Sequence, residues 1–219
     1  MEPFAIVALG LVLGVRHATD PDHVVAVTAI AVRYRRIAPA ALVGVVWGLG
    51  HSLTILVVGG AIILFNIAVP ARVGLAFEFA VGLALAIVGA LNLFARGGFA
   101  QGHDHEPPPV PTARAFGLGL VHGLAGSAAV ALLVLAAVKD PRVALLYLAV
   151  FAFGTILGMT LITLGLAAPV RVLGAKWPGL GVPLRVATGT LSLLFGVYVL
   201  YHVGWIDGLF GAAPTWSPH

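Results

Sequence analysis

Residues 16–23, Arg-His-Ala-Thr-Asp-Pro-Asp-His, interrupt a stretch of chain that otherwise resembles a membrane span. Apolar and small residues precede them from Phe4 to Val15 and follow them from Val24 to Val32. An aspartate or arginine at the centre of a bilayer costs about 2.5–3.5 kcal/mol even on lenient insertion scales, so such residues usually face a cavity and serve a function. Neutral imidazole and carboxylate together bind divalent transition metals. The stretch therefore predicts a broken first transmembrane helix that carries a metal site.

The composition is that of an integral membrane protein. Of the 219 residues, 60% are hydrophobic and only 9% are charged, whereas soluble domains carry about 25% charged residues. Cysteine is absent, which excludes disulfides, thiolate metal sites and cysteine nucleophiles. The net charge is +4, and the arginines responsible for it lie between the apolar segments. This distribution indicates loop topology rather than binding of nucleic acid.

Six apolar segments are long enough to cross a bilayer, which takes about 20 residues. They predict an all-α fold with spans at about 4–31, 40–64, 73–95, 115–138, 143–168 and 183–204. The connections are short except for a polar, Gly- and Pro-rich segment that contains His103-Asp104-His105-Glu106, a candidate for weak metal capture. We expect a first three-helix repeat at 1–95, this cytoplasmic loop at 96–114, and a second three-helix repeat at 115–219.

Positive residues gather in alternate loops. The first, third and fifth loops hold eight of them, namely Arg33, Arg35, Arg36, Arg96, Arg114, Arg171, Lys176 and Arg185. The second and fourth loops hold three, namely Arg72, Lys139 and Arg142. By the positive-inside rule, we expect a multi-pass protein of the cell (inner, cytoplasmic) membrane with both termini outside.

The two halves of the chain resemble each other at a nearly constant offset. The matches pair Leu13-Gly14 and His17 with Leu118-Gly119 and His122 (105 residues later), Trp47–Gly50 with Phe151–Gly154 (104), and Gly82 and Gly89 with Gly189 and Gly196 (107). Each half holds an odd number of spans, so the halves would be inverted relative to each other. Such 3+3 inverted repeats recur in secondary transporters, whose substrate site lies near the midplane on broken helices.

The histidines and aspartates of the first span are the first candidates for metal ligands. His17, Asp20 and His23 follow at intervals of three and share one helical face. Pro21 leaves the carbonyl of His17 without its helical donor, and it drives Asp20 away from helical geometry. A kink there would turn Asp22 inward and offer a backbone oxygen. A polar surface loop is the alternative, although the twelve apolar residues before it are too few to cross the membrane.

Two further histidines lie within apolar spans. His51 lies near the middle of the second span, beside glycines that permit close helix approach, and we interpret it as a ligand rather than as an ordinary hydrogen-bonded histidine. His122 occupies the position of His17 in the second half, where Ala125 and Ser127 replace the aspartates. A role along the transport pathway and simple packing are both open for His122.

These residues resemble the signatures of the nickel/cobalt transporter family. The stretch 17–23 matches the family's H-x₄-D-H signature, and Gly50-His51-Ser52 resembles its Gly-His-Ser in the following span. The resemblance implies that His17, Asp22, His23 and His51 bear on recognition of nickel or cobalt, with Asp20 as a close motif member. Many members have eight spans. Six spans, with His122 in place of the acidic second-half signatures, resemble the compact branch of urease-accessory-type nickel permeases.

The predicted function is secondary transport of Ni²⁺ or Co²⁺, with no cofactor beyond the transported ion and with nickel-enzyme maturation proteins as candidate partners. The chain lacks a Gly-x₄-Gly-Lys-Ser/Thr loop, so it does not itself hydrolyse ATP. An inside-negative potential of 100 mV favours entry of a divalent cation by about 4.6 kcal/mol, which favours uptake. Export driven by proton exchange through the same histidines is the alternative, and some relatives in the wider group export metal.

Two other classes of function fit the residues less well. An intramembrane serine protease would pair Ser127 with His202, but the serine is not in a Gly-x-Ser-Gly setting and the first-span cluster would have no role. A haem-binding electron carrier would use two of His17, His51 and His122, with acidic residues unusually close to the iron ligands. We therefore expect a transporter and not an enzyme.

Overall fold

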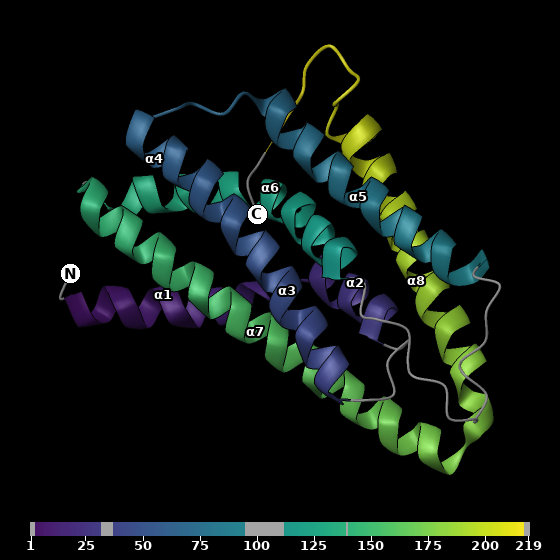
Figure 1. The fold of residues 1–219 in the computed structure, drawn as a ribbon. Coiled ribbons are helices and arrows are strands. Elements are labelled where there is room, and N and C mark those ends of the chain that lie inside the picture. Colours follow the sequence, from purple (N-terminus) through teal and green to yellow (C-terminus); the bar gives the residue numbers. More distant parts are fainter. Residues whose placement is uncertain (1–2, 32–36, 95–111, 139, 217–219) are drawn as a thin grey trace.

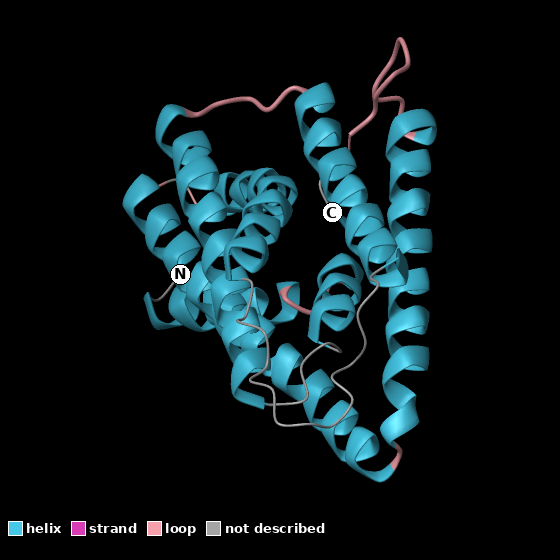
Figure 2. Ribbon diagram, turned by 45° about the vertical axis from the view of Figure 1, so that its right-hand side comes forward, coloured by secondary structure: helices cyan, strands magenta, loops and turns pink. Residues whose placement is uncertain are grey.

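The computed structural model describes residues 3–31, 37–94, 112–138 and 140–216, and the regular structure within these ranges is helical (Figure 1, Figure 2). In chain order the helices are α1 (Pro3–His17), α2 (Pro21–Ala31), α3 (Ile37–Thr54), α4 (Gly60–Phe65), α5 (Ala71–Phe94), α6 (Thr112–Ala137), α7 (Pro141–Lys176) and α8 (Gly181–Tyr201). The π-helical turns η1 (Ile55–Gly59) and η3 (His202–Ile206) extend α3 and α8, and the 3₁₀ turn η2 (Pro178–Leu180) precedes α8. The predicted all-α fold is confirmed.

Four helical stretches in the described parts are long and apolar enough to cross a membrane, namely Ile37–Phe65, Ala71–Phe94, Pro141–Val170 and Gly181–Ile206. They coincide with four of the six predicted spans. The predicted span at 4–31 consists of two helices that are individually short, and α6 covers the predicted span at 115–138. The candidate metal-capture tract at 103–106 lies outside the described residues. The chain is thus a helical membrane protein.

The first span is interrupted where the proline predicts. Pro21 suits the first position of α2, because a proline lacks the N–H that this position leaves unpaired. In the turn between the helices, the N–H of Thr19 donates to the Arg16 carbonyl (2.8 Å) and the N–H of Asp20 donates to the His17 carbonyl (3.1 Å). The backbone oxygen that we expected to face an ion is therefore already bonded within the chain.

Glycines bring the helices that carry the histidines into backbone contact. α1 packs along α7, and α3 packs along both α6 and α7 (Figure 1). A Cβ atom placed on Gly14 would lie 2.1 Å from the carbonyl oxygen of Phe151, and one on Gly119 would lie 2.2 Å from that of Trp47. Only glycine fits such crossings, so they hold α1 and α6 tightly against their neighbours.

A second pair of helices, α5 and α8, runs side by side through the same kind of contact (Figure 1). A Cβ atom on Gly89 would lie 2.4 Å from the Leu193 nitrogen, and one on Gly196 would lie 2.5 Å from the Ala86 nitrogen. α2 contacts both of these helices as well as α7. The second half of the broken span is therefore held between the two groups of helices.

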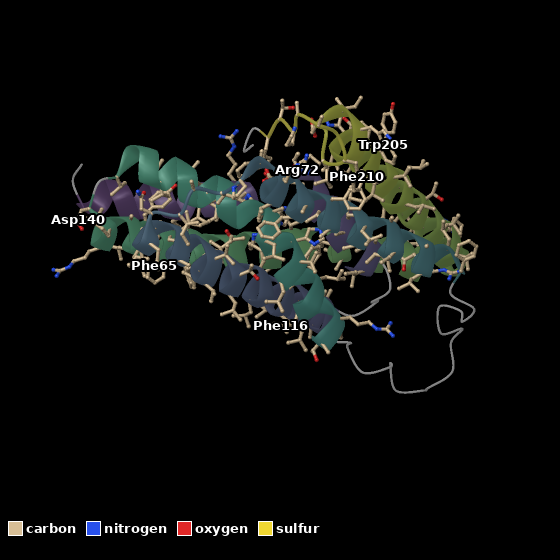
Figure 3. The ribbon with its side chains drawn as sticks, turned by 90° about the horizontal axis from the view of Figure 1, so that it is seen from above. Phe65, Arg72, Phe116, Asp140, Trp205 and Phe210 are labelled. Carbon is tan, nitrogen blue, oxygen red and sulfur yellow. The ribbon has the colours of Figure 1, made fainter. Side chains whose placement is uncertain are left out.

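Many large apolar side chains lie on the outer surface, and several polar side chains are buried inside. Figure 3 shows Phe65 and Trp205 pointing away from the bundle, and they are 74% and 67% exposed. Asp140 stands at one end of the bundle, where its Oδ1 accepts a hydrogen bond from the Arg142 N–H (2.8 Å) and begins α7. Buried polar side chains include His23, His51, His122, Asn92 and Thr155. This inversion of the soluble pattern suits a lipid environment.

Candidate metal site

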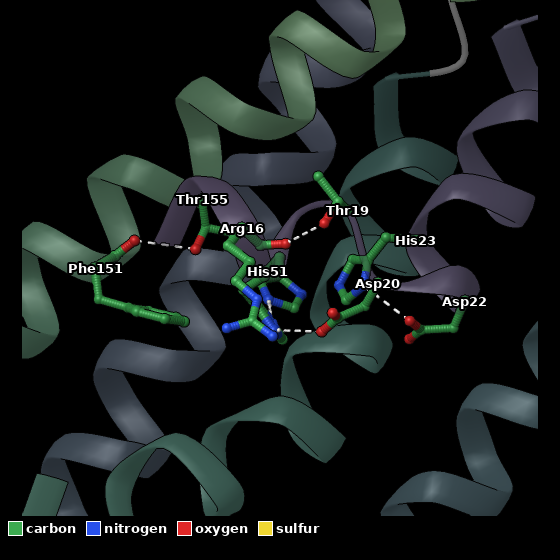
Figure 4. A network of polar contacts seen from close by, with 9 residues as sticks. Arg16, Thr19, Asp20, Asp22, His23, His51, Phe151 and Thr155 are labelled. Carbon is green, nitrogen blue, oxygen red and sulfur yellow. Dashed lines mark hydrogen bonds and ion pairs between the residues drawn. The ribbon is translucent and has the colours of Figure 1, made fainter. Parts of the chain in front are cut away.

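Three histidines from α1, α2 and α3 converge inside the bundle, where Figure 4 shows His51 and His23 beside Asp20 and Asp22. One nitrogen from each of His17, His23 and His51 lies within 4.8 Å of the others. The Nε2 atoms of His17 and His51 are 3.1 Å apart. Two nitrogens bound at right angles to one ion at about 2.1 Å are about 3.0 Å apart. The three imidazoles are thus close enough to share one transition-metal ion.

The site lies at mid-depth of a candidate span. His51 is the central residue of Ile37–Phe65, so about 21 Å of helix separates it from either end. His51 and His23 are 0% and 2% exposed. Within the described part of the chain, His23 Nε2 and His51 Nδ1 are buried without a hydrogen-bond partner. Buried polar atoms are rarely left unpaired, and here a bound cation would satisfy them.

The two aspartates contact the histidines rather than one another. Asp20 Oδ2 accepts from His17 Nδ1 (2.8 Å), and Asp22 Oδ1 accepts from His23 Nδ1 (2.9 Å; Figure 4). A proton on each Nδ1 leaves each Nε2 with a lone pair for a metal. Metal-binding histidines usually have such a carboxylate or carbonyl on their other nitrogen. All five predicted site residues are therefore brought together, with imidazoles in the centre and carboxylates behind two of them.

Neighbouring hydroxyl groups hold the middle of α3 against α7 and α6. Ser52 Oγ donates to the Ala152 carbonyl (2.8 Å), and Thr54 Oγ1 donates to the Leu120 carbonyl (3.1 Å). On the α7 side the ring of Phe151 lies 5.4 Å from the ring of His17, centroid to centroid. The two hydroxyl bonds fix the part of α3 that carries His51 from two sides, and Phe151 packs against His17, which is the support that a preorganised binding site requires.

Two aromatic residues that sequence reasoning left outside the site lie against it. The indole of Trp47 stacks on His23 at 6.5 Å between centroids, and His122 lies 5.2 Å from the same indole and 5.7 Å from His23. Trp47 precedes His51 by one helical turn and therefore lies on the same helical face. This spacing could have identified Trp47 from the sequence as a neighbour of the site. His122 was interpreted as a copy of His17 with either a pathway or a packing role, and nothing in the sequence places it beside His23.

The remaining candidates are placed elsewhere or not described. His202 Nδ1 donates to Asp207 Oδ2 (3.0 Å) at the end of the last helix, and among the described residues His202 forms no metal-binding group with other histidines. The side chain of Ser127 is not among those described. The haem-binding alternative would place a haem between two histidines. The Nε2 atoms of His17 and His51 nearly touch, so a haem plane does not fit between these two.

The fold and the partly buried site define a class, namely a polytopic helical membrane protein with a histidine cluster that could hold a divalent transition-metal ion. The chain is 34% identical to the urease accessory protein UreH of Bacillus sp. (strain TB-90) in an alignment of 221 positions that covers 96% of each protein. It belongs to that family, and the suspected membership in the urease-accessory branch of the nickel/cobalt transporters is confirmed. That relative is named as an accessory protein of urease and not as an enzyme in its own right. No protein-family model and no solved structure matches the chain.

Proposed function

We propose that this protein is a secondary transporter that carries Ni²⁺, or Co²⁺, into the cell through His17, His23 and His51. The observation that carries the proposal is the meeting of three imidazoles, two of them buried, within 4.8 Å of one another at mid-depth of the bundle. Imidazole suits nickel and cobalt as well as copper and zinc, and kinship with a urease accessory protein favours nickel. Proteins that mature a nickel enzyme would then receive the ion on the cytoplasmic side.

In the proposed site the histidines bind the ion and the aspartates orient the histidines. Nε2 of His17 and of His23 face the ion, together with one nitrogen of His51. Asp20 and Asp22 hold the two Nδ1 protons and supply negative charge within a few ångströms of the cation, which offsets its charge. Direct coordination by either carboxylate needs a movement away from its histidine.

Replacing Asp22 with asparagine tests this division of roles. Asparagine retains an acceptor for the His23 Nδ1–H but lacks the charge, so we expect Ni²⁺ affinity to fall about 10-fold, at the low end for an orienting carboxylate. Isothermal titration of purified protein measures the dissociation constant. Asp140→Asn, just before the first residue of α7, is the control and should bind Ni²⁺ as the wild type does. Nickel X-ray absorption spectra of the wild type and the variant provide the contrary test. If the spectrum shows a carboxylate oxygen bound to nickel in the wild type and none in the variant, Asp22 is a direct ligand instead.

We further propose that the chain is a 3+3 inverted repeat of residues 1–95 and 115–219 joined by the loop at 96–114. The helix contacts are consistent with such a repeat, because equivalent contacts recur in the two halves at offsets of 104 and 105 residues. A Cβ atom on Gly154 would lie 2.5 Å from the carbonyl oxygen of Leu11, and one on Gly50 would lie 2.3 Å from that of Phe116. Gly154 is equivalent to Gly50, and Leu11 is equivalent to Phe116. The crossings of Gly14 with Phe151 and of Gly119 with Trp47 are related in the same way. Equivalent contacts suit a transporter whose halves exchange conformations.

Uptake into proteoliposomes tests the transport function and its direction. With an inside-negative potential imposed, we expect Ni²⁺ and Co²⁺ to accumulate faster than Zn²⁺, because the potential favours entry of a divalent cation by about 4.6 kcal/mol per 100 mV. Empty liposomes and liposomes without potential are the controls. Metal movement that follows an imposed pH gradient and ignores the voltage would replace uptake with proton-coupled export. The absence of any metal flux would refute the transporter. The proposed orientation in the inner membrane, with both termini outside, is testable by protease access to the same vesicles.

A further inference from the structure

His122 is a buried histidine that the proposed site does not use. It is 1% exposed and comes from α6, whereas the three proposed ligands come from α1, α2 and α3. Its ring centroid lies 5.7 Å from that of His23 and 5.2 Å from that of Trp47. The group that fits a single ion contains His17, His23 and His51 but not His122.

The hydrogen bonds of His122 prepare it as a ligand. Its Nδ1 contacts the carbonyl oxygen of Leu118 at 3.0 Å, and a carbonyl accepts only, so the ring proton lies on Nδ1. Nε2 then carries a lone pair, and it is buried without a partner among the described residues. His23 has the same arrangement, with Nδ1 on Asp22 and an unpaired Nε2. Two neighbouring imidazoles therefore present lone pairs that nothing in the described structure satisfies.

A transported ion must also leave the site that binds it. Transport needs binding that is weak enough, or divided among enough sites, for release. An ion bound to three imidazoles would leave most easily by exchanging one ligand at a time for another close by. His23 is the only proposed ligand for which a ring contact with His122 is found in the described structure.

We propose that Nε2 of His122 and Nε2 of His23 form a second, weaker station for the transported cation, which it enters on leaving His17 and His51. This inference rests on the proposed transport function and adds the next step of the ion's path. The two stations share His23, and two divalent cations so close together would repel each other strongly. One ion therefore occupies them in turn. Trp47, in contact with both rings, lies beside the ion in either position.

The substitution His122→Asn separates this role from a packing role. The asparagine amide can still donate to the Leu118 carbonyl, but no group remains at the position of Nε2. We expect equilibrium Ni²⁺ affinity within about threefold of the wild type, because the first station is intact, and uptake slower by about 10-fold or more. His202→Asn, at a histidine outside the site, is the matched control. Uptake within about twofold of the wild type would overturn the proposal, and so would a parallel loss of affinity and uptake.

Residual binding gives a second test that does not depend on transport. Protein with His17→Ala and His51→Ala should retain weak Ni²⁺ binding at the second station, and adding His122→Asn should abolish it. Equilibrium dialysis with Ni²⁺ measures both. Residual binding that is absent, or that survives His122→Asn, overturns the second station. The transporter proposal fails separately, if the double variant still takes up Ni²⁺ like the wild type.

Discussion

Replacing His51 with alanine is expected to weaken Ni²⁺ binding by about 100-fold or more and to reduce uptake to background. Loss of a residue that only orients a ligand costs 10–100-fold in metal affinity, so loss of a ligand should cost at least the upper value. His51 is fully buried, contacts His17 through Nε2, and has an Nδ1 without a hydrogen-bond partner among the described residues, so no described side chain replaces its nitrogens. Titration of purified protein and uptake into proteoliposomes measure the two effects.

The control for this variant is His202→Ala, which removes a histidine whose partner is Asp207 and leaves the site untouched. Both variants should elute as single species on size exclusion, because the removal of one imidazole from α3 leaves its contacts with α6 and α7 in place. A folded His51→Ala protein that binds and transports Ni²⁺ within about twofold of the wild type would contradict the proposed ligand set.

A methyl group added at Gly119 is expected to destabilise the protein by about 3 kcal/mol, at the upper end of the range for overpacking. The new Cβ atom would lie 2.2 Å from the carbonyl oxygen of Trp47 and 2.9 Å from the nitrogen of His51. Both are backbone atoms, so no side chain can rotate away and α6 must move from α3. For a chain of this length, the melting temperature in detergent should fall by roughly 6–12 °C.

Gly117→Ala is the matched control, since it makes the same change two residues earlier on the same helix. A Cβ atom at Gly117 meets nothing within 4 Å, and alanine favours a helix over glycine by about 1 kcal/mol. This variant should therefore melt at or slightly above the wild-type temperature. Equal melting temperatures for the two variants would mean that α3 and α6 are not packed as closely as described.

Much of the fold follows from hydropathy and from single residues. Apolar stretches of about 20 residues must be helical in lipid, because each backbone polar group needs a partner inside the segment. Pro21 has no N–H to donate, so the break between α1 and α2 was predictable from its position. The predicted spans at 40–64 and 73–95 lie within a few residues of the helical stretches Ile37–Phe65 and Ala71–Phe94. Helix ends were less predictable, as the extension of α7 to Lys176 shows.

The candidate site was predictable in its membership but not in its arrangement. His17, Asp20, Asp22, His23 and His51 were singled out because charged and imidazole groups at membrane depth are costly without a role. Which atoms face one another depends on how the turn after His17 directs each side chain. The carbonyl of His17 is bonded to the Asp20 N–H and the carboxylates bond the Nδ1 atoms. Spacing along an ideal helix contains none of this.

The sequence alone determined that the chain is helical, lies in a membrane, breaks at Pro21 and carries histidines where lipid would exclude them. These conclusions depend on local covalent chemistry and on the transfer of single side chains, which are properties of the residues themselves. Only the tertiary structure decided that His51 meets His17 and that Trp47 and His122 lie beside His23. Those contacts join residues far apart in the chain, and they depend on how the helices pack, including the glycine crossings of α1 with α7 and of α3 with α6.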